Sequence, residues 1–162
     1  MLIGIPTIYA LFFGSPFIPT KKKDIQRILE HLPLKDGMTI YDLGCGDGRF
    51  LTTISKKATI QAIGYEYSPL VWFIAQIRNF LHRGKNVKIY YSSYFKANLS
   101  DADIIFLFLM PQRMEKIREK LQKECKKDTI VVSHGFKIPG LKEIRFLEKT
   151  NKHEFPTYFY NV

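Results

Sequence analysis

Apolar residues follow two alternating spacings along the chain. Between residues 21 and 32 they recur every three or four positions, which predicts an amphipathic helix that Pro33 ends. The same spacing predicts further helices over 48–57, 68–83 and 112–125. Shorter and more continuous apolar runs lie between these helices. They predict a strand that begins at Thr39 and four more over 59–67, 87–93, 102–109 and 129–136.

Two more extended segments, 141–148 and 156–162, follow the fifth of these strands. Regular alternation of strand and helix is typical of parallel strands joined by helical crossovers. Five central strands and a terminal pair therefore predict an α/β fold with a doubly wound, seven-stranded sheet in three α/β/α layers. A length of 162 residues suits one domain. We assign that domain to residues 20–162.

Residues 1–19 form a separate apolar N-terminal segment that contains no charged side chain. Helix-breaking residues interrupt it at Pro6, Gly14, Pro16 and Pro19. Its smoother part, 1–13, is shorter than the roughly 20 residues of a membrane-spanning helix. The lysines at 21–23 would favour an anionic membrane surface. Two interpretations stay open: the segment associates with a membrane, or it packs over the domain.

Three glycines at alternate positions follow the first predicted strand, at Gly44, Gly46 and Gly48. Glycines at a strand-to-helix turn allow positive φ and a close approach of backbone to ligand. The following helix offers unpaired N–H groups to an anionic group. Arg49 stands where a dinucleotide fingerprint needs its last glycine, and no Gly-Lys-Ser/Thr sequence is present for a phosphate loop. A nucleotide-type site of another kind is therefore predicted, and a glycine turn without ligand is the structural alternative.

The run from Asp42 to Gly48, Asp-Leu-Gly-Cys-Gly-Asp-Gly, resembles the cofactor motif of the class I, Rossmann-like methyltransferases that use S-adenosylmethionine. This resemblance implies that S-adenosyl-L-methionine is the cofactor. It assigns Asp42, Gly44, Cys45, Gly46 and Gly48 to cofactor binding. The glycine loop would then receive the methionine portion of the cofactor.

Glu66 ends the second predicted strand, 22 residues beyond Gly44. An acid at this place in such αβ units accepts hydrogen bonds from both ribose hydroxyls, because a carboxylate has two acceptor oxygens. Tyr67 could lie against the face of the adenine. The alternatives are a solvated carboxylate at a strand end and an aromatic side chain that shields the sheet.

Composition and charge narrow the class of protein less sharply. The chain is 46% apolar and 25% charged, as expected of a folded globular protein. A net charge of +10 would attract acidic partners in general. The two cysteines, Cys45 and Cys125, make no disulfide framework and suit a reducing, cytoplasmic compartment. No cluster of cysteine and histidine has the spacing of a metal site, so no metal is predicted.

From about Gly14 onward the chain resembles a narrower family: the membrane-anchored lysine methyltransferases that modify the c-subunit of ATP synthase and the adenine nucleotide translocase, with their prokaryotic relatives. The segments that carry this resemblance, besides the cofactor motif, are Ser-Pro-Phe-Ile-Pro-Thr at 15–20, Gly-Tyr-Glu-Tyr-Ser-Pro at 64–69, Leu-Met-Pro-Gln at 109–112 and Val-Val-Ser-His-Gly-Phe at 131–136. The resemblance implies a lysine side chain of a protein as methyl acceptor. It also implies that residues 1–13 are a remnant of a membrane-associating segment.

Two positions depart from the family pattern. Relatives carry an acid near the adenine amine at the end of the third strand, where this chain has Ser92 and Ser93. Serine can still hydrogen-bond the adenine, without a charge. Ser93 and Tyr94 therefore complete the predicted cofactor set. Gly135 stands where relatives tend to have an acid, which puts the choice of substrate in question.

The acceptor would enter where the fourth and fifth strands end, beneath Pro19 and Thr20. The candidate residues there are Thr20, Met110, Gln112, Ser133 and His134, and none is assigned as the general base. The run at 109–112 lacks the Asp/Asn-Pro-Pro-aromatic sequence of many nucleobase amino methyltransferases, so nucleic acid is not the expected substrate.

The sequence thus predicts a methyltransferase, foremost a protein-lysine N-methyltransferase that acts at or near a membrane. Two alternatives remain. The first is a methyltransferase for a small-molecule or lipid-like acceptor, since no separate substrate domain is present. The second is a protein that binds S-adenosylmethionine without catalysis. The sequence makes no prediction of the oligomeric state.

Overall fold

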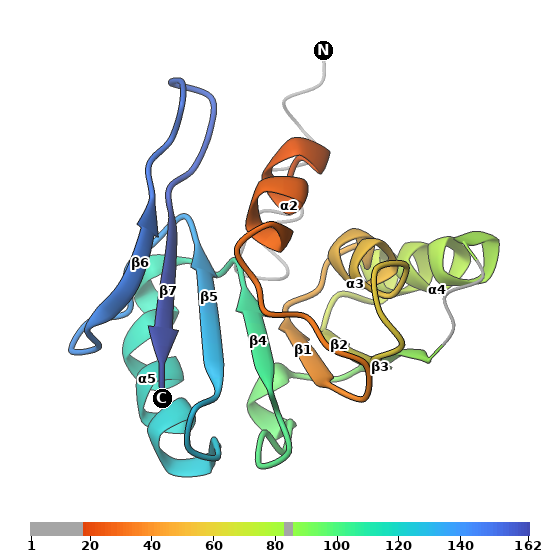
Figure 1. Ribbon diagram of the computed structural model, residues 1–162. Coiled ribbons are helices and arrows are strands. Elements are labelled where there is room, and N and C mark those ends of the chain that lie inside the picture. Colours follow the sequence, from red (N-terminus) through yellow and green to blue (C-terminus); the bar gives the residue numbers. More distant parts are fainter. Residues whose placement is uncertain (1–17, 83–85) are drawn as a thin grey trace.

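The computed structural model describes residues 18–82 and 86–162, in which a seven-stranded sheet carries helices on both faces (Figure 1). The strands are β1 (Thr39–Leu43), β2 (Gln61–Glu66), β3 (Val87–Tyr91), β4 (Ile104–Leu107), β5 (Ile130–His134), β6 (Glu143–Leu147) and β7 (Thr157–Asn161). Their order across the sheet is β3-β2-β1-β4-β5-β7-β6. The first five are parallel, and β7 runs antiparallel between β5 and β6. The predicted α/β fold with a doubly wound, seven-stranded sheet is confirmed.

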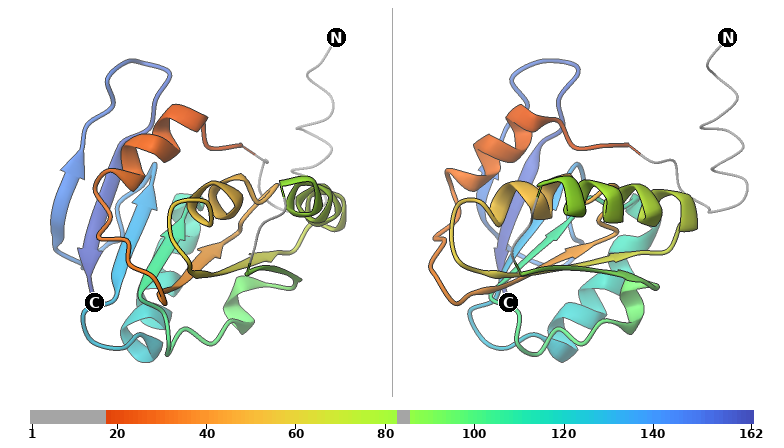
Figure 2. Two further views of the ribbon diagram at one scale, coloured as in Figure 1. Left: turned by 45° about the vertical axis from the view of Figure 1, so that its right-hand side comes forward. Right: turned by 90° about the vertical axis from the view of Figure 1, so that its right-hand side faces the viewer.

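Helices on the two faces complete the three predicted layers (Figure 2). On one face lie α2 (Lys22–Leu29), α3 (Arg49–Ile54) and α4 (Pro69–His82). On the other lie α5 (Met114–Glu124) and the short 3-10 turns η1 (Tyr94–Lys96) and η2 (Pro111–Arg113). Parallel strands covered in this way read as continuous apolar runs, because both faces of the sheet are buried.

Successive residues of the central strands point into two separate hydrophobic cores. Ile40 and Ile104 join the core beneath α2 and α3, which also contains Ile25 and Phe50. Their neighbours Tyr41 and Ile105 join the core beneath α5, which contains the inward-facing residues Met114, Ile117 and Leu121. This alternation follows from the two-residue period of a strand. β1 therefore contributes side chains to both cores, and the helices on both faces of the sheet pack against it.

The helix boundaries are tighter than the sequence predicts. The helix predicted over 21–32 ends at Leu29, after which the backbone forms i→i+3 hydrogen bonds: His31 N donates to Ile28 O and Leu32 N donates to Leu29 O. The helix predicted over 112–125 begins as the 3-10 turn η2, with Pro111 at its first position. Such ends shift by one or two residues without changing the fold.

The N-terminal segment predicted at 1–19 lies outside the described residues except for Ile18 and Pro19, and so does residue 83, the end of the helix predicted over 68–83. None of the helices in the described part of the chain is both long and apolar enough to cross a membrane.

Candidate active site

The loop after β1 turns sharply at its three glycines. Gly44, Gly46 and Gly48 have φ angles of +79°, +56° and +73°, a region that residues with a Cβ rarely adopt. β1 has β2 on one side and β4 on the other, so the strand order reverses at β1. Ligands of doubly wound sheets bind in the crevice that opens at this switch point, beyond the carboxyl ends of the strands.

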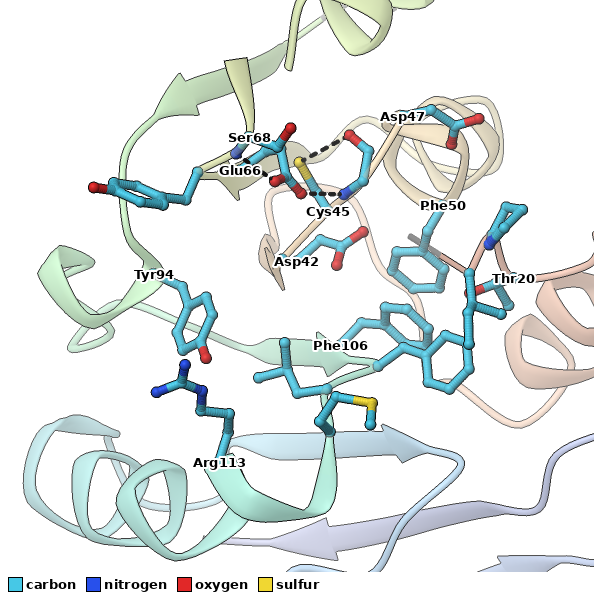
Figure 3. Close-up of a pocket in the computed structure, with 18 of the residues that line it drawn as sticks. Thr20, Asp42, Cys45, Asp47, Phe50, Glu66, Ser68, Tyr94, Phe106 and Arg113 are labelled. Atoms are coloured by element: carbon cyan, nitrogen blue, oxygen red, sulfur yellow. Dashed lines mark hydrogen bonds between the residues drawn. The ribbon is translucent and has the colours of Figure 1, made fainter. Parts of the chain in front are cut away.

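Glu66, at the end of β2, closes one side of the crevice. Its carboxylate accepts hydrogen bonds from the backbone N–H groups of Gly46, at 3.0 Å, and Ser68, at 2.8 Å (Figure 3). Burial raises the pKa of Glu66, and these backbone donors offset part of that rise. Each carboxylate oxygen retains a further acceptor position. The side chain is therefore fixed in place and can still accept hydrogen bonds from the two hydroxyls of a ribose.

Asp42, in β1, is a second buried carboxylate in the crevice, with 2% of its surface exposed. Burial, with the negative charges of Glu66 and Asp47 in addition, raises its pKa well above the usual range. Arg49 and Arg78 pair with Asp47 instead of Asp42. A buried carboxylate in this condition is stabilised by a positive charge. The ammonium and sulfonium groups of S-adenosylmethionine would supply one.

Asp47 holds the glycine loop to the helices behind it. Its Oδ2 accepts hydrogen bonds from Nη2 of Arg49, at 2.7 Å, and from Nη2 of Arg78 in α4, at 2.9 Å. Burial acts to raise its pKa, but the two guanidinium groups outweigh that effect and its pKa lies below the usual value. Asp47 is not among the site residues that the sequence predicts. The only feature of the sequence that could have identified Asp47 is its acidic side chain within the glycine motif. Its partner Arg78 lies 31 residues further along the chain, so the ion pair is not visible in local sequence.

Most of the residues predicted for the site line one cavity of about 730 Å³. From the cofactor set these are Asp42, Gly44, Cys45, Gly46, Glu66, Tyr67, Ser93 and Tyr94. From the acceptor set they are Thr20, Met110 and Gln112. The cavity also contacts Ile18 and Pro19, so the boundary predicted at residue 20 falls within its lining.

Three predicted residues are not in this lining. Gly48 lies behind the loop and precedes the first residue of α3, and a Cβ there would come within 3.0 Å of Ile89 Cδ1. It therefore shapes the turn. Ser133 and His134, candidates for the acceptor side, lie in the interior of the sheet.

The hydrogen bonds of Ser133 and His134 explain their position. Ser133 Oγ donates to the backbone oxygen of Phe136 at 2.6 Å. Nδ1 of His134 is hydrogen-bonded to Oγ1 of Thr157 at 2.8 Å, across the antiparallel β5–β7 pair. Burial lowers the pKa of His134 to about 4, so the ring is neutral near pH 7. β7 pairs with β5 across these two positions, and neither candidate residue is in the cavity lining.

The cavity has an apolar end and a polar end. Phe50 and Phe106 stack with their ring centroids 4.0 Å apart and lie beside Thr20 (Figure 3). Tyr94 and Arg113 lie on the other side of Asp42, with the Tyr94 hydroxyl directed at the guanidinium group (Figure 3). The sequence predicts none of Phe50, Phe106 or Arg113 as site residues. Apolar strand and helix positions such as Phe50 and Phe106 are more commonly core, and no motif marks Arg113.

Two details bear on the adenine side. Tyr67 is 64% exposed and stacks on Tyr91, with ring centroids 6.3 Å apart and an interplanar angle of 14°. It is thus available as a flat surface at the rim of the cavity, and its contact with adenine stays a prediction. Ser93 Oγ accepts a hydrogen bond from Phe95 N at 3.3 Å, which starts η1 and turns the chain toward Tyr94.

Comparison with known proteins agrees with this geometry. The model of the family described as "ANTKMT methyltransferase domain" matches residues 42–145. A protein-lysine N-methyltransferase of Saccharolobus islandicus is 33% identical over 91% of this chain and 93% of the relative. The human lysine N-methyltransferase of the ATP synthase c-subunit is 32% identical over 76% of this chain, and the match covers 53% of the human protein. The chain thus spans about half the length of that relative.

A solved structure with the same fold contains a product of the cofactor. The RNA methyltransferase of Salinibacter ruber in complex with S-adenosyl-L-homocysteine superposes with a TM-score of 0.83 at 25% identity, over 90% of this chain and 94% of the other. Glu66, the glycine loop and the buried carboxylate of Asp42 suit the ribose, the methionine portion and the positive charge of such a ligand.

The sheet order and the crevice therefore define a class I methyltransferase whose cofactor is S-adenosylmethionine. Because the family model covers more than half of the chain, the assignment can be made narrower. The chain belongs to the ANTKMT methyltransferase domain family.

Proposed function

We propose that this methyltransferase acts on lysine side chains of a protein substrate. The observation that carries the proposal is the apolar end of the cavity, where the partly exposed Phe108, Leu109 and Met110 line it together with the buried, stacked rings of Phe50 and Phe106. The aliphatic stem of a lysine fits an apolar surface of this kind, with its nitrogen toward Asp42. The relative in Saccharolobus islandicus, which is named for lysine methylation and covers nearly the whole chain, supports the same substrate class.

Bound S-adenosylmethionine supplies an electrophilic methyl group on a sulfonium. The residues of this chain bind the cofactor, orient the acceptor toward it and exclude water from the site. Glu66 would accept hydrogen bonds from the ribose hydroxyls, and Asp42 and the glycine loop would face the charged methionine portion. Met110 and Gln112 line the cavity where the fourth strand ends, at the side from which an acceptor would enter.

The apolar end of the cavity also favours loss of the proton from the acceptor lysine. A lysine ammonium cannot attack a methyl group until it loses its proton. Desolvation against Phe50, Phe106 and Phe108 lowers the pKa of an inserted lysine, and the positive charge of the cofactor lowers it further. Among the acids of the cavity lining, Asp47 and Glu66 are already engaged by arginines and backbone N–H groups. Asp42 faces the charged methionine portion of the cofactor, so no carboxylate of the cavity lining is assigned as the general base.

A labelling assay tests this proposal. The full chain is incubated with S-adenosylmethionine carrying a labelled methyl group and a cell extract separated into protein, RNA and small-molecule fractions. We expect label in the protein fraction, recovered after acid hydrolysis as methylated lysine. Label confined to the small-molecule fraction would instead establish the alternative acceptor class. Binding of the cofactor with no transfer to any fraction would support a non-catalytic binding protein.

The RNA fraction is included because the similar Salinibacter ruber protein is an RNA methyltransferase and because this chain carries a net charge of +10. We expect no label there, since the sequence after β4 at 109–112 lacks the Pro-Pro-aromatic run of nucleobase enzymes. A cytoplasmic location at or near a membrane remains part of the proposal. The free thiols of Cys45 and Cys125 are consistent with the reducing compartment.

A further inference from the structure

The outward face of α4 is lined with apolar side chains along its whole length. Val71 and Ala75 are the residues that this helix buries against the rest of the domain. On the other side a second apolar stripe recurs at helical spacing and is exposed: Leu70, Phe73, Ile74, Ile77, Phe80 and Leu81. Phe80 is 82% exposed and Leu81 is 70% exposed. Single exposed leucines are common, but a continuous exposed stripe on one helix indicates a contact surface.

Among the described residues, neither the fold nor the cofactor site uses this stripe. The flank of α4 toward β3 is occupied by polar side chains, since Trp72 Nε1 and Gln76 Nε2 both donate to Ile89 O. The flank toward α3 carries Arg78, which pairs with Asp47. By the helical period, the exposed stripe lies between these two flanks and opposite the buried Val71 and Ala75.

A basic groove runs beside the stripe, between α2, α3 and α4. It encloses about 480 Å³ and its charged or ionisable lining residues are Lys22, Arg49, Lys56, Arg78 and His82. Within residues 18–82 and 86–162, no carboxylate lines it. Because Asp47 pairs with both arginines, the cationic groups left for a ligand are Lys22 and Lys56, with Nδ1 of His82 at 3.4 Å from Lys56 Nζ. The groove therefore offers charge-assisted hydrogen bonds to an anion.

We propose that the exposed stripe of α4 and this groove together form a docking surface for an anionic phospholipid bilayer. The apolar side chains enter the boundary between headgroups and acyl chains, and a lipid phosphate occupies the groove. An apolar helix face with cations at its edge has the chemistry of interfacial membrane binding. The 14 residues of α4 provide a contact about 21 Å long.

Two other occupants of this surface can be considered: a second copy of the chain, and its own segment 1–17. Charge favours an anionic bilayer over both. A second copy packed about a two-fold axis would bring two basic grooves to one interface, where they repel each other. The segment 1–17 contains no charged side chain and cannot neutralise Lys22 or Lys56. An anionic bilayer provides both an apolar environment for the stripe and a negative charge for the groove. Tyr67 and Ser68 line the cofactor cavity immediately before α4, so docking would also hold that cavity near the bilayer.

Sedimentation of the full chain with vesicles tests the stripe. The vesicles contain either phosphatidylcholine alone or phosphatidylcholine mixed with phosphatidylglycerol. We expect binding to the anionic mixture and an at least tenfold weaker partition for the double variant Phe80→Ser, Leu81→Ser. The matched control is Ile144→Ser, Phe146→Ser, which removes two exposed apolar side chains from β6. The control should bind as the unchanged chain does.

A second pair of variants tests the groove. Lys56→Gln should weaken binding to the anionic vesicles several-fold, whereas Lys123→Gln, in the last turn of α5 on the other face, should leave it unchanged. Trp72 is the single tryptophan of the sequence and lies in α4, so brominated lipids should quench its fluorescence on binding. Transferase activity is not needed for any of these measurements.

Three results would overturn the proposal. One is binding that the α4 variant and the β6 control reduce equally. Another is a chain that does not bind the vesicles but loses thermal stability when Phe80 and Leu81 are changed. That result would mean that another part of this chain covers the stripe. The third is a dimer in solution that the α4 variant dissociates, with no binding to vesicles.

Discussion

Arg78 of α4 reaches across to the glycine loop, where its Nη2 lies 2.9 Å from Oδ2 of Asp47. Arg49 donates to the same carboxylate from the start of α3. One buried acid thus joins the cofactor loop to two helices. Loop geometry and helix packing are coupled through this ion pair, so its loss should affect both.

The variant Asp47→Asn should lower the free energy of unfolding at pH 7 by about 1–3 kcal/mol, because two guanidinium groups lose their counter-charge in a partly buried place. The pKa of Asp47 is lower in the folded state than in the unfolded chain. Its stabilisation is therefore complete above about pH 4 and is lost as the pH falls further. Urea unfolding at pH 7 and pH 3 measures this.

The control for that experiment is Glu119→Gln, an exposed carboxylate in α5, which should change the free energy of unfolding by less than about 0.5 kcal/mol. A difference between Asp47→Asn and the unchanged chain that is as large at pH 3 as at pH 7 would contradict the ion-pair account.

Glu66→Gln should weaken the binding of S-adenosylhomocysteine at least tenfold. An amide has one acceptor oxygen, so its NH₂ group would face either the Gly46 or the Ser68 N–H, and one ribose contact would be lost as well. Titration calorimetry measures the affinity, and Glu30→Gln, an exposed residue at the end of α2, is the control. Equal affinities for Glu66→Gln and the unchanged chain would remove Glu66 from the ribose site.

Gly64→Ala should be destabilising for a steric reason. A Cβ at this position in β2 would lie 2.6 Å from Leu51 Cδ1 and 2.7 Å from Cys45 Sγ, beneath the glycine loop. We expect a loss of about 1–3 kcal/mol in the free energy of unfolding, as for overpacked cores. Gly37→Ala provides the comparison, because Gly37 has φ of +86° and open space around it. Its cost, about 1 kcal/mol, is conformational strain alone. Urea unfolding that ranks Gly37→Ala as the more costly change would refute the close approach.

His134 should make stability fall as the solution becomes acidic. Its pKa is about 4 when folded and near 6.5 when unfolded, so the unfolded chain binds a proton first. The contribution is complete above pH 6.5 and decreases by about 3 kcal/mol as the pH falls to 4. Nearby Asp24, whose Oδ2 is 4.0 Å from Nε2, has a raised pKa because of burial and Glu154, and titrates in the opposite sense.

The variant His134→Asn isolates the histidine term from that of Asp24. The pH profile of its free energy of unfolding should lack the decrease between pH 6.5 and 4 that the unchanged chain shows. Its affinity for S-adenosylhomocysteine should remain within about threefold, since His134 is outside the cavity lining. A large loss of affinity without a loss of stability would return His134 to the active site.

Local chemistry made the cofactor half of the site predictable. The glycine loop and Glu66 depend on backbone conformation and on the end of one strand, and both are visible in a short stretch of sequence. The β-α alternation similarly predicted a seven-stranded sheet, which the structure confirms. The position of β7 between β5 and β6 was not predictable, because nothing local distinguishes the order of two terminal strands.

The position of β7 beside β5 determines where the residues predicted for the acceptor side lie. His134 faces Thr157 only because β7 pairs with β5, so its burial depends on a residue 23 positions away. Phe50 and Phe106 likewise had the sequence signature of core, and they do belong to a core. Their second role as a wall of the cavity depends on where α3 and β4 meet in space. Long-range packing of this kind leaves no trace in local spacing.

The antiparallel insertion of β7 also has a consequence for how the chain reaches its fold. Until β7 emerges during synthesis, β5 has a free edge, and 22 residues separate the two strands. An exposed edge of apolar strand is open to pairing with other chains. The partly made protein should therefore be more prone to aggregation than the finished one, and folding should be limited by the late closure of this long-range pair.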